Sequence, residues 1–240
     1  MKKWLPLLLL VFPLFALDMT YYIQKKPCLI FDVGAHLGDK TDLYLKLRPK
    51  KIVCLEPQPE CAESLRHRFA RYESVTILQM GCSDHIGEVP FFINSGATTL
   101  STASPEWTIL ERFQAWESWR TWDKRITIST TTLDALIDQY GIPDFCKIDV
   151  EGYELTVLKG LTRAIPYLSF EFLPEYLETK TKPCLDHLYA LGYRHFNACF
   201  YNTEKMVYSK WMDKDVLFEK LKAHPDPELC GDIYAILNPE

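Results

Sequence analysis

Short apolar runs alternate along the chain with longer segments of helical periodicity. The first apolar run, residues 28–33, precedes residues 39–48, in which Leu43 and Leu47 lie four positions apart on one helix face. Runs that are apolar throughout are typical of strands buried on both faces, and their repetition with helices predicts a mostly parallel sheet. The further predicted strands are 51–56, 75–79, 145–150, 167–172 and 232–237, and the further predicted helices are 59–72, 131–140, 152–159 and 182–191.

The alternation breaks in the middle of the chain. Residues 88–94 and 125–129 have the pattern of two antiparallel edge strands. Residues 95–123 lie between them and form an insertion that is rich in Ser, Thr and Trp. The sequence therefore predicts an α/β fold with helices on both faces of a mostly parallel sheet and an antiparallel edge.

Aromatic residues concentrate in this insertion. Phe113, Trp116 and Trp119 recur every three residues and so share one face of a predicted helix. One interpretation packs this face on the sheet, with Trp107 and Trp122 beside it. The alternative is a lid whose rings stack on a sugar or a flat acceptor.

Length and composition indicate one globular domain, residues 18–240, behind a distinct N-terminal segment. The chain has 240 residues, of which 48% are hydrophobic. Lys2 and Lys3 precede the apolar segment 4–17, which resembles a signal peptide or an uncleaved membrane anchor. This segment predicts an exported or membrane-associated protein, and the alternative is a buried arm of a cytoplasmic one.

Charge and cysteine placement exclude several classes of protein. The net charge of −5 disfavours a general electrostatic grip on nucleic acid. The eight cysteines include no C-x-x-C pair, so we expect buried thiols rather than a disulfide framework or a zinc site. No cluster of metal ligands is expected either. A basic helix patch is interpreted as a solvated face and consists of Arg66, His67, Arg68 and Arg71.

The first chemical signal is a glycine-bearing turn after the first strand. Gly34 and Gly38 stand in a Gly-x-x-x-Gly spacing, which lacks one glycine of the dinucleotide fingerprint. We expect Gly34 to let the backbone approach a ligand and Gly38 to permit a tight entry into the helix. The turn therefore suits a nucleoside without phosphate, such as S-adenosylmethionine, whose amino-acid end would meet the turn and the helix N-terminus.

The second signal is Glu56, which ends the second predicted strand. An ionised carboxylate only accepts hydrogen bonds, so it can receive both hydroxyl hydrogens of a ribose. The alternative is an exposed carboxylate at a strand end. Because Glu56 follows the glycine turn by one strand, the ribose role is the preferred interpretation.

The third signal is the segment 146–152. Strand alternation puts Lys147, Asp149 and Glu151 on one side of an otherwise apolar strand. Three charges there are costly unless the surroundings are polar, and the two carboxylates fall where a pocket should open. The ordinary alternative is an ion pair through Lys147 that holds the strand end.

These segments together resemble the FkbM-type methyltransferases. The similarity spans about residues 28–175, with His36 and Gln79 at positions where the family often has Asn. It is carried by the turn 32–38, the end Leu55-Glu56-Pro57, Ser83-Asp84, residues 132–134, and the string 147–152 followed by Glu154 and 158–160.

The resemblance implies a Rossmann-like class I methyltransferase fold, S-adenosyl-L-methionine as cofactor, and O-methylation of a hydroxyl on a sugar or natural-product-like small molecule. Asp149, then His36, are the candidates for proton acceptance from the acceptor hydroxyl, and Glu151 is a third catalytic candidate. The expected cofactor-binding residues are Asp32, Gly34, Ala35, His36, Gly38, Glu56, Pro57, Gly81, Asp84 and Asp149.

Two other functions stay open. The same fold serves RNA and protein methyltransferases, although the acidic charge disfavours RNA. An exported interaction protein could also keep the fold without catalysis. The segment 4–17 supports that alternative, because the methyl donor is made in the cytosol.

Overall fold

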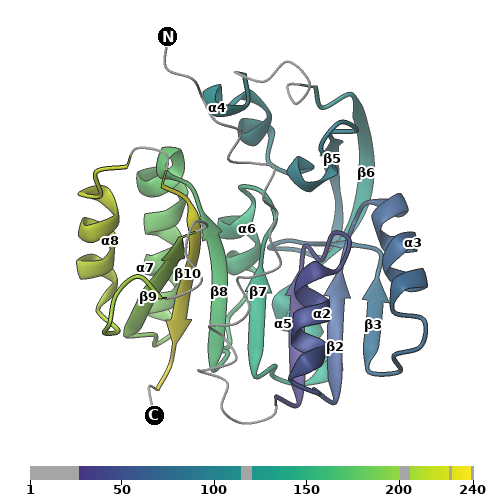
Figure 1. The fold of residues 1–240 in the computed structure, drawn as a ribbon, viewed down its shortest axis with the longest axis horizontal. Helices are drawn as coiled ribbons and strands as arrows, with labels where there is room; N and C mark the ends of the chain where they lie inside the picture. The colour runs from purple at the N-terminus through teal and green to yellow at the C-terminus, as the bar shows by residue number, and fades with distance from the viewer. Residues whose placement is uncertain (1–26, 115–120, 201–205, 227–228, 239–240) are drawn as a thin grey trace.

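The computed structural model describes residues 27–114, 121–200, 206–226 and 229–238 (Figure 1). The predicted signal peptide or anchor therefore lies outside the described residues, as do Trp116 and Trp119. Among the helices that are described, none is both long and apolar enough to cross a membrane.

The described strands form a mostly parallel central sheet. In chain order its strands are β1 (Leu29–Val33), β2 (Lys51–Leu55), β3 (Val75–Leu78), β7 (Phe145–Ile148), β8 (Tyr167–Phe172), β9 (His195–Phe200) and β10 (Gly231–Ile236). Their spatial order is β3-β2-β1-β7-β8-β10-β9, and β10 runs antiparallel to both of its neighbours. The order reverses at β1, so the carboxyl ends of β1 and β7 flank the crevice where ligands of such sheets bind.

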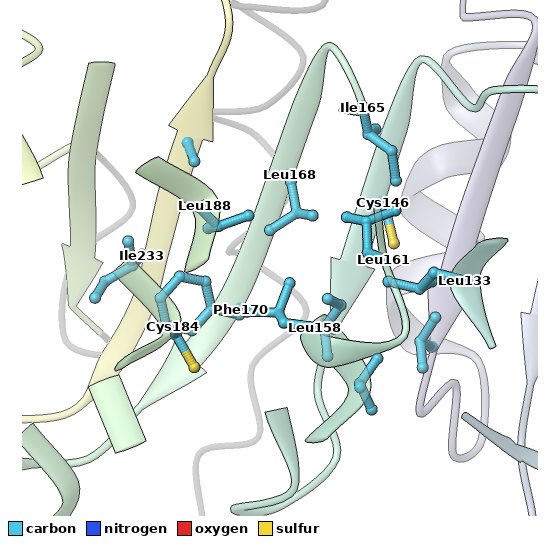
Figure 2. Close-up of a cluster of buried hydrophobic side chains, with 14 of the residues drawn as sticks. Leu133, Cys146, Leu158, Leu161, Ile165, Leu168, Phe170, Cys184, Leu188 and Ile233 are labelled. Carbon is cyan, nitrogen blue, oxygen red and sulfur yellow. The ribbon is translucent and has the colours of Figure 1, made fainter. Parts of the chain in front are cut away.

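Helices cover both faces of the sheet, as the sequence predicts (Figure 1). One face packs against α5 (Leu133–Tyr140), α6 (Glu154–Lys159), α7 (Lys182–Ala190) and α8 (Lys214–Lys222). Figure 2 shows part of this core, where Cys146 and Phe170 of the sheet meet Leu158 and Leu188 of the helices. The other face packs against α2 (Asp39–Lys46) and α3 (Pro59–Arg68).

The two strands expected at an antiparallel edge form a separate small sheet. β5 (Gly87–Ile93) pairs antiparallel with β6 (Lys124–Thr131), and β4 (Gly81–Cys82) joins β6 on its other side. The antiparallel pairing is therefore confirmed, whereas the antiparallel member of the central sheet is β10. In Figure 1 this small sheet rises above the tips of the parallel strands.

The insertion folds into short turns and builds a small core of its own. Its described part contains 3₁₀ turns at Thr98–Leu100 and Pro105–Ile109 and the short helix α4 (Glu111–Gln114). Trp107 and Phe113 are buried together with Leu173 and Tyr176, which follow β8. The described aromatic residues thus support the interpretation in which the insertion packs on the rest of the fold, here on the segment that follows β8.

The structure differs from the predicted elements at the start of one helix and in two elements that the sequence did not indicate. The helix predicted over 131–140 begins at Leu133, because Thr131 ends β6 and Thr132 caps α5 with its hydroxyl, which accepts from the Ala135 amide at 3.0 Å. Two elements were not predicted, β9 and α8, although Gly192 precedes β9 and the Asp213 side chain caps α8. None of the eight cysteines forms a disulfide.

Candidate cofactor site

The turn between β1 and α2 is held in a left-handed backbone conformation at three positions. The φ angles are 85° at Gly34, 48° at His36 and 87° at Gly38, which caps α2. The amides of Gly34 and Ala35 both donate to the Leu55 carbonyl at 3.0 Å, so the turn is tied to the end of β2. The expected tight entry into the helix is confirmed at Gly38, where an added Cβ would lie 2.4 Å from the Phe69 ring.

Gly34 has a structural reason besides the approach to a ligand, which stays a prediction. A Cβ at this position would lie 1.8 Å from the Asp149 carbonyl oxygen. The glycine is therefore required because the β1 turn and the end of β7 approach each other closely. This contact brings Asp149 next to the turn.

Glu56 lies at the tip of β2 with its carboxylate held from two sides. One oxygen accepts from the His36 amide and the other from the Gln58 amide, each at 2.8 Å. Each carboxylate oxygen has a further lone pair, so two acceptor positions remain for a pair of hydroxyl hydrogens. Burial raises the pKa of Glu56 to about 7, against the two amide hydrogen bonds that lower it.

The insertion lies across this carboxylate. The Thr98 hydroxyl forms a hydrogen bond with the His36 ring at 2.9 Å. The Thr98 carbonyl accepts a hydrogen bond from the Gln58 side chain at 3.0 Å. Thr98 thus bridges the two residues whose amides hold Glu56, which is only 2% exposed. Burial lowers the pKa of His36, so its ring is held neutral against Thr98.

Asp32 belongs to a buried polar layer under α2. Its carboxylate accepts from the Thr41 hydroxyl at 2.6 Å, and the side chain is 1% exposed. Burial raises the pKa of Asp32. The register puts Asp32 beside Lys147 of β7, whose ammonium pairs with Asp232 of β10 at 2.6 Å. Asp32 therefore supports the site from below, and its role in binding the cofactor stays a prediction.

Asp149 lies at the end of β7 between two ammonium groups. It forms an ion pair with Lys40 of α2 and lies 3.5 Å from the Lys147 nitrogen. Burial opposes ionisation, but these two cations outweigh it and hold the pKa of Asp149 well below its usual range. A carboxylate this acidic is a poor proton acceptor, so the geometry favours a binding or positioning role for Asp149.

Glu151 has the opposite electrostatic environment. Burial, then the nearby Glu171 carboxylate, raises its pKa well above the usual value. Its φ of 55° places it in a left-handed turn, and its carbonyl accepts from the Thr102 hydroxyl of the insertion at 2.7 Å. Of the two carboxylate candidates, Glu151 is therefore the one whose environment increases its affinity for a proton.

Glu154 stabilises the same turn without belonging to the predicted site. One of its oxygens accepts from the Val150 and Gly152 amides, each at 3.1 Å. Burial raises its pKa to about 7.

Three carboxylates gather at the ends of β7 and β8, although the expectation that no site binds a metal tightly stays a prediction. Asp149, Glu151 and Glu171 each bring a carboxylate oxygen within 4.8 Å of the others. Such a set could accept a divalent cation, but carboxylates gather in this way without one, and Lys40 and Lys147 already neutralise Asp149. Glu171 escaped the sequence reasoning because it lies on β8, one strand away from the motif.

The remaining predicted residues have contacts elsewhere. Pro57 directly follows Glu56. Gly81 packs against Ile128 of the small sheet, and Asp84 pairs with the His85 ring at 2.7 Å. The structure thus brings the β1 turn, Glu56 and Asp149 together, whereas these contacts of Gly81 and Asp84 lie in and beside the small sheet.

Sequence reasoning missed three residues that contact the site. Lys40, Gln58 and Thr98 each hydrogen-bond with a predicted site residue or with its immediate neighbour. The positions of Lys40 after the glycine turn and Gln58 after Glu56 are signals that could have found two of them. The role of Thr98 could not be predicted from the sequence, because it depends on where the insertion packs in the folded chain.

Comparison with known proteins identifies the fold and its motifs. The model of the methyltransferase FkbM domain matches residues 32–195. The chain belongs to the FkbM methyltransferase family. The matched range contains the β1 turn, Glu56, Asp149 and Glu171, and the Rossmann-like fold expected from the resemblance is confirmed.

Three characterised relatives share about a quarter to a third of the aligned residues. The 2-O-methyltransferase NoeI of Sinorhizobium fredii is 26% identical over 58% of this chain and 59% of its own length. The hexuronic acid methyltransferase AglP of Haloferax volcanii is 26% identical over 59% of this chain and 53% of its own. The methyltransferase sdnD of Sordaria araneosa is 30% identical over 60% and 65%. The matches therefore span between about half and two thirds of these relatives.

Proposed function

We propose that this FkbM family member transfers a methyl group from S-adenosylmethionine to a hydroxyl of a sugar or natural-product-like small molecule. The observation that carries the proposal is the position of Glu56 beside the glycine turn at the reversal point of the sheet. Two characterised relatives support the acceptor class, since one is named a 2-O-methyltransferase and the other a hexuronic acid methyltransferase.

The residues of the site fit an adenosyl ligand that has no phosphate. Glu56 would accept the ribose hydroxyl hydrogens through its two remaining lone-pair positions. Asp149, beside Gly34, would meet the amino-acid end. Because Glu56 is 2% exposed, the contacts of Thr98 with His36 and Gln58 have to open before a ribose reaches it.

When bound, S-adenosylmethionine supplies a methyl group already activated on a sulfonium. The task of the protein is then to align the acceptor oxygen with that methyl group, and alignment of this kind contributes up to about 7–11 kcal/mol. Glu151, in its ionised form, would take the proton of the acceptor hydroxyl, because its environment favours the protonated product. Asp149 would stay ionised throughout, because Lys147 remains beside it on the buried side.

The direct test is transfer of a radiolabelled methyl group by the full chain. The acceptors are a panel of free hexoses, hexuronic acids and short glycans, and the control variant is Glu56→Ala. We expect label in at least one hydroxyl-bearing acceptor with the wild type and a strongly reduced rate with the variant. Label in RNA or protein alone would replace the proposed acceptor class, and no binding of S-adenosylhomocysteine by the folded chain would overturn the proposal.

A further inference from the structure

Lys40 is the cation of the site that a ligand can reach. It is the second residue of α2 and follows the glycine turn directly. Its side chain is 30% exposed, whereas that of Lys147 is 2% exposed beneath the sheet end. Both lysines contact Asp149. Lys40 contacts it from the side that solvent can reach, and Lys147 contacts it from the buried side.

Asp149 keeps a cationic partner when Lys40 turns away. Lys147 lies 3.5 Å from Asp149 and 2.6 Å from Asp232, so it stays a partner of both carboxylates, although its single charge balances only one of them. The Lys40–Asp149 pair is strongly coupled, because burial works against the charge of Asp149 and its lysine partners offset that cost. Lys40 can therefore leave Asp149 only when a cation of the ligand takes its place.

The turn and the first helical turn otherwise lack a free cation for an anionic ligand. Within residues 34–42 the basic side chains are His36 and Lys40. The His36 ring is bonded to Thr98. Arg68 approaches this region from α3, but its guanidinium is engaged by Asp39 and Asp42. The N-terminus of α2 adds a partial positive charge on the same side as Lys40.

The amino-acid end of S-adenosylmethionine is a zwitterion, with one ammonium and one carboxylate on the same carbon. The Lys40–Asp149 pair offers the complementary two charges beside the turn. We infer that Lys40 binds the α-carboxylate of the cofactor, exchanging its ion pair with Asp149 for this contact, and leaves Asp149 to accept the α-ammonium. This inference rests on the proposed function and adds a cofactor-binding residue that the sequence motifs do not contain.

The test is a cycle that removes one charge from the protein and one from the ligand. Calorimetry measures the binding of S-adenosylhomocysteine and of its α-carboxyl methyl ester to the wild type and to Lys40→Met. With the wild type, we expect esterification to weaken binding about 10- to 100-fold, the range for a lost charge-assisted hydrogen bond. With Lys40→Met, we expect the acid to bind that much more weakly and the ester penalty to shrink to about twofold or less.

Two controls make the result specific. Lys46→Met removes an exposed lysine from the last turn of the same helix and should leave both affinities unchanged. Lys40→Arg keeps the charge and should keep most of the preference for the acid. If Lys40→Met does not fold, Lys40→Gln, which keeps a polar side chain without the charge, takes its place in the cycle.

The outcomes separate this inference from the proposed function. An equal loss of both ligands in Lys40→Met would show that Lys40 only holds Asp149 in place, and would overturn the inference. A wild-type protein that does not distinguish acid from ester would overturn it as well. If the wild type binds neither ligand, the proposed cofactor is wrong and the inference fails with it.

Discussion

The two faces of the central sheet are built from alternate residues of the same strands, yet they have different interiors. Phe31 and Ile148 point into the apolar core under α5 and α6. Their neighbours Asp32 and Lys147 are on the face covered by α2 and are 1% and 2% exposed. One face therefore stabilises the fold by burying apolar surface, and the other buries charges that connect β1, β7 and β10 directly beneath the candidate site.

The charged face of the sheet, and not the apolar face, leads to the candidate site. Buried charges are costly, and a charged network rarely stabilises more than an apolar one of the same size. Here the network ends at Asp149 and Lys40, at the carboxyl ends of the strands, where a polar ligand would bind. Substitutions on each face, followed by measurements of stability and ligand binding, test whether the two faces contribute separately.

The largest effect is expected on the apolar face. Phe170 is fully buried in the core that Figure 2 shows, so Phe170→Ala should lower the free energy of unfolding by about 4 kcal/mol, measured by urea denaturation. The control is Ile86→Ala, at a position 72% exposed, which should change stability by less than about 0.5 kcal/mol. A loss below about 1 kcal/mol for Phe170→Ala would contradict the assigned core.

A somewhat smaller loss is expected on the charged face. Lys147→Met leaves Asp232 buried without its 2.6 Å partner and should cost about 3 kcal/mol by the same measurement. Adding Asp232→Leu removes the uncompensated charge, so the double variant should regain much of the stability. A double variant whose loss equals the sum of the two single losses would show that the pair is not a unit.

The pKa of Glu56 predicts a pH dependence of ligand binding. Glu56 has a pKa of about 7 in the free protein, so it is mostly protonated at pH 6 and mostly ionised at pH 8. Because the ionised form is the better acceptor for two hydroxyl hydrogens, affinity for S-adenosylhomocysteine should rise about tenfold from pH 6 to pH 8. The pKa of Glu154 is also about 7, so Glu56→Gln is the necessary control. A rise that persists in Glu56→Gln would assign the titration to another group.

The smallest effect is expected on the exposed helix surface. Arg68 pairs with Asp39 at 2.8 Å and with Asp42, and all three side chains are well exposed. Arg68→Ala should cost less than about 1 kcal/mol of unfolding free energy, and the cost should shrink in concentrated salt. A salt-independent loss above about 2 kcal/mol would mean that Arg68 is part of the folded core.

The sequence predicted the parts of the fold that local patterns determine. The apolar run 28–33 became β1, the glycine spacing became the turn, and Glu56 ended β2 as its position indicated. Each of these features lies within one strand–turn–helix unit, where periodicity and turn chemistry specify the structure.

Contacts between distant segments were not predictable in the same way. Glu171 joins Glu151 because β8 lies beside β7, and Thr98 reaches His36 because the insertion folds back over the strand ends. The electrostatic contrast between Asp149 and Glu151, two positions apart, also depends on Lys40 and Glu171. Strand alternation alone predicts the same environment for both carboxylates. Only the tertiary contacts show that the pKa of Asp149 is lowered and that of Glu151 is raised.

The assignment of the cofactor site depends on the carboxylate of Glu56 holding the ribose of a phosphate-free adenosyl ligand. Calorimetric titration of S-adenosylhomocysteine into the wild type and into Glu56→Ala at pH 8 measures this contribution. We expect the wild type to bind and the variant to bind about 30-fold or more weakly, which corresponds to about 2 kcal/mol for the lost hydrogen bonds. Equal affinities in two folded proteins would contradict it.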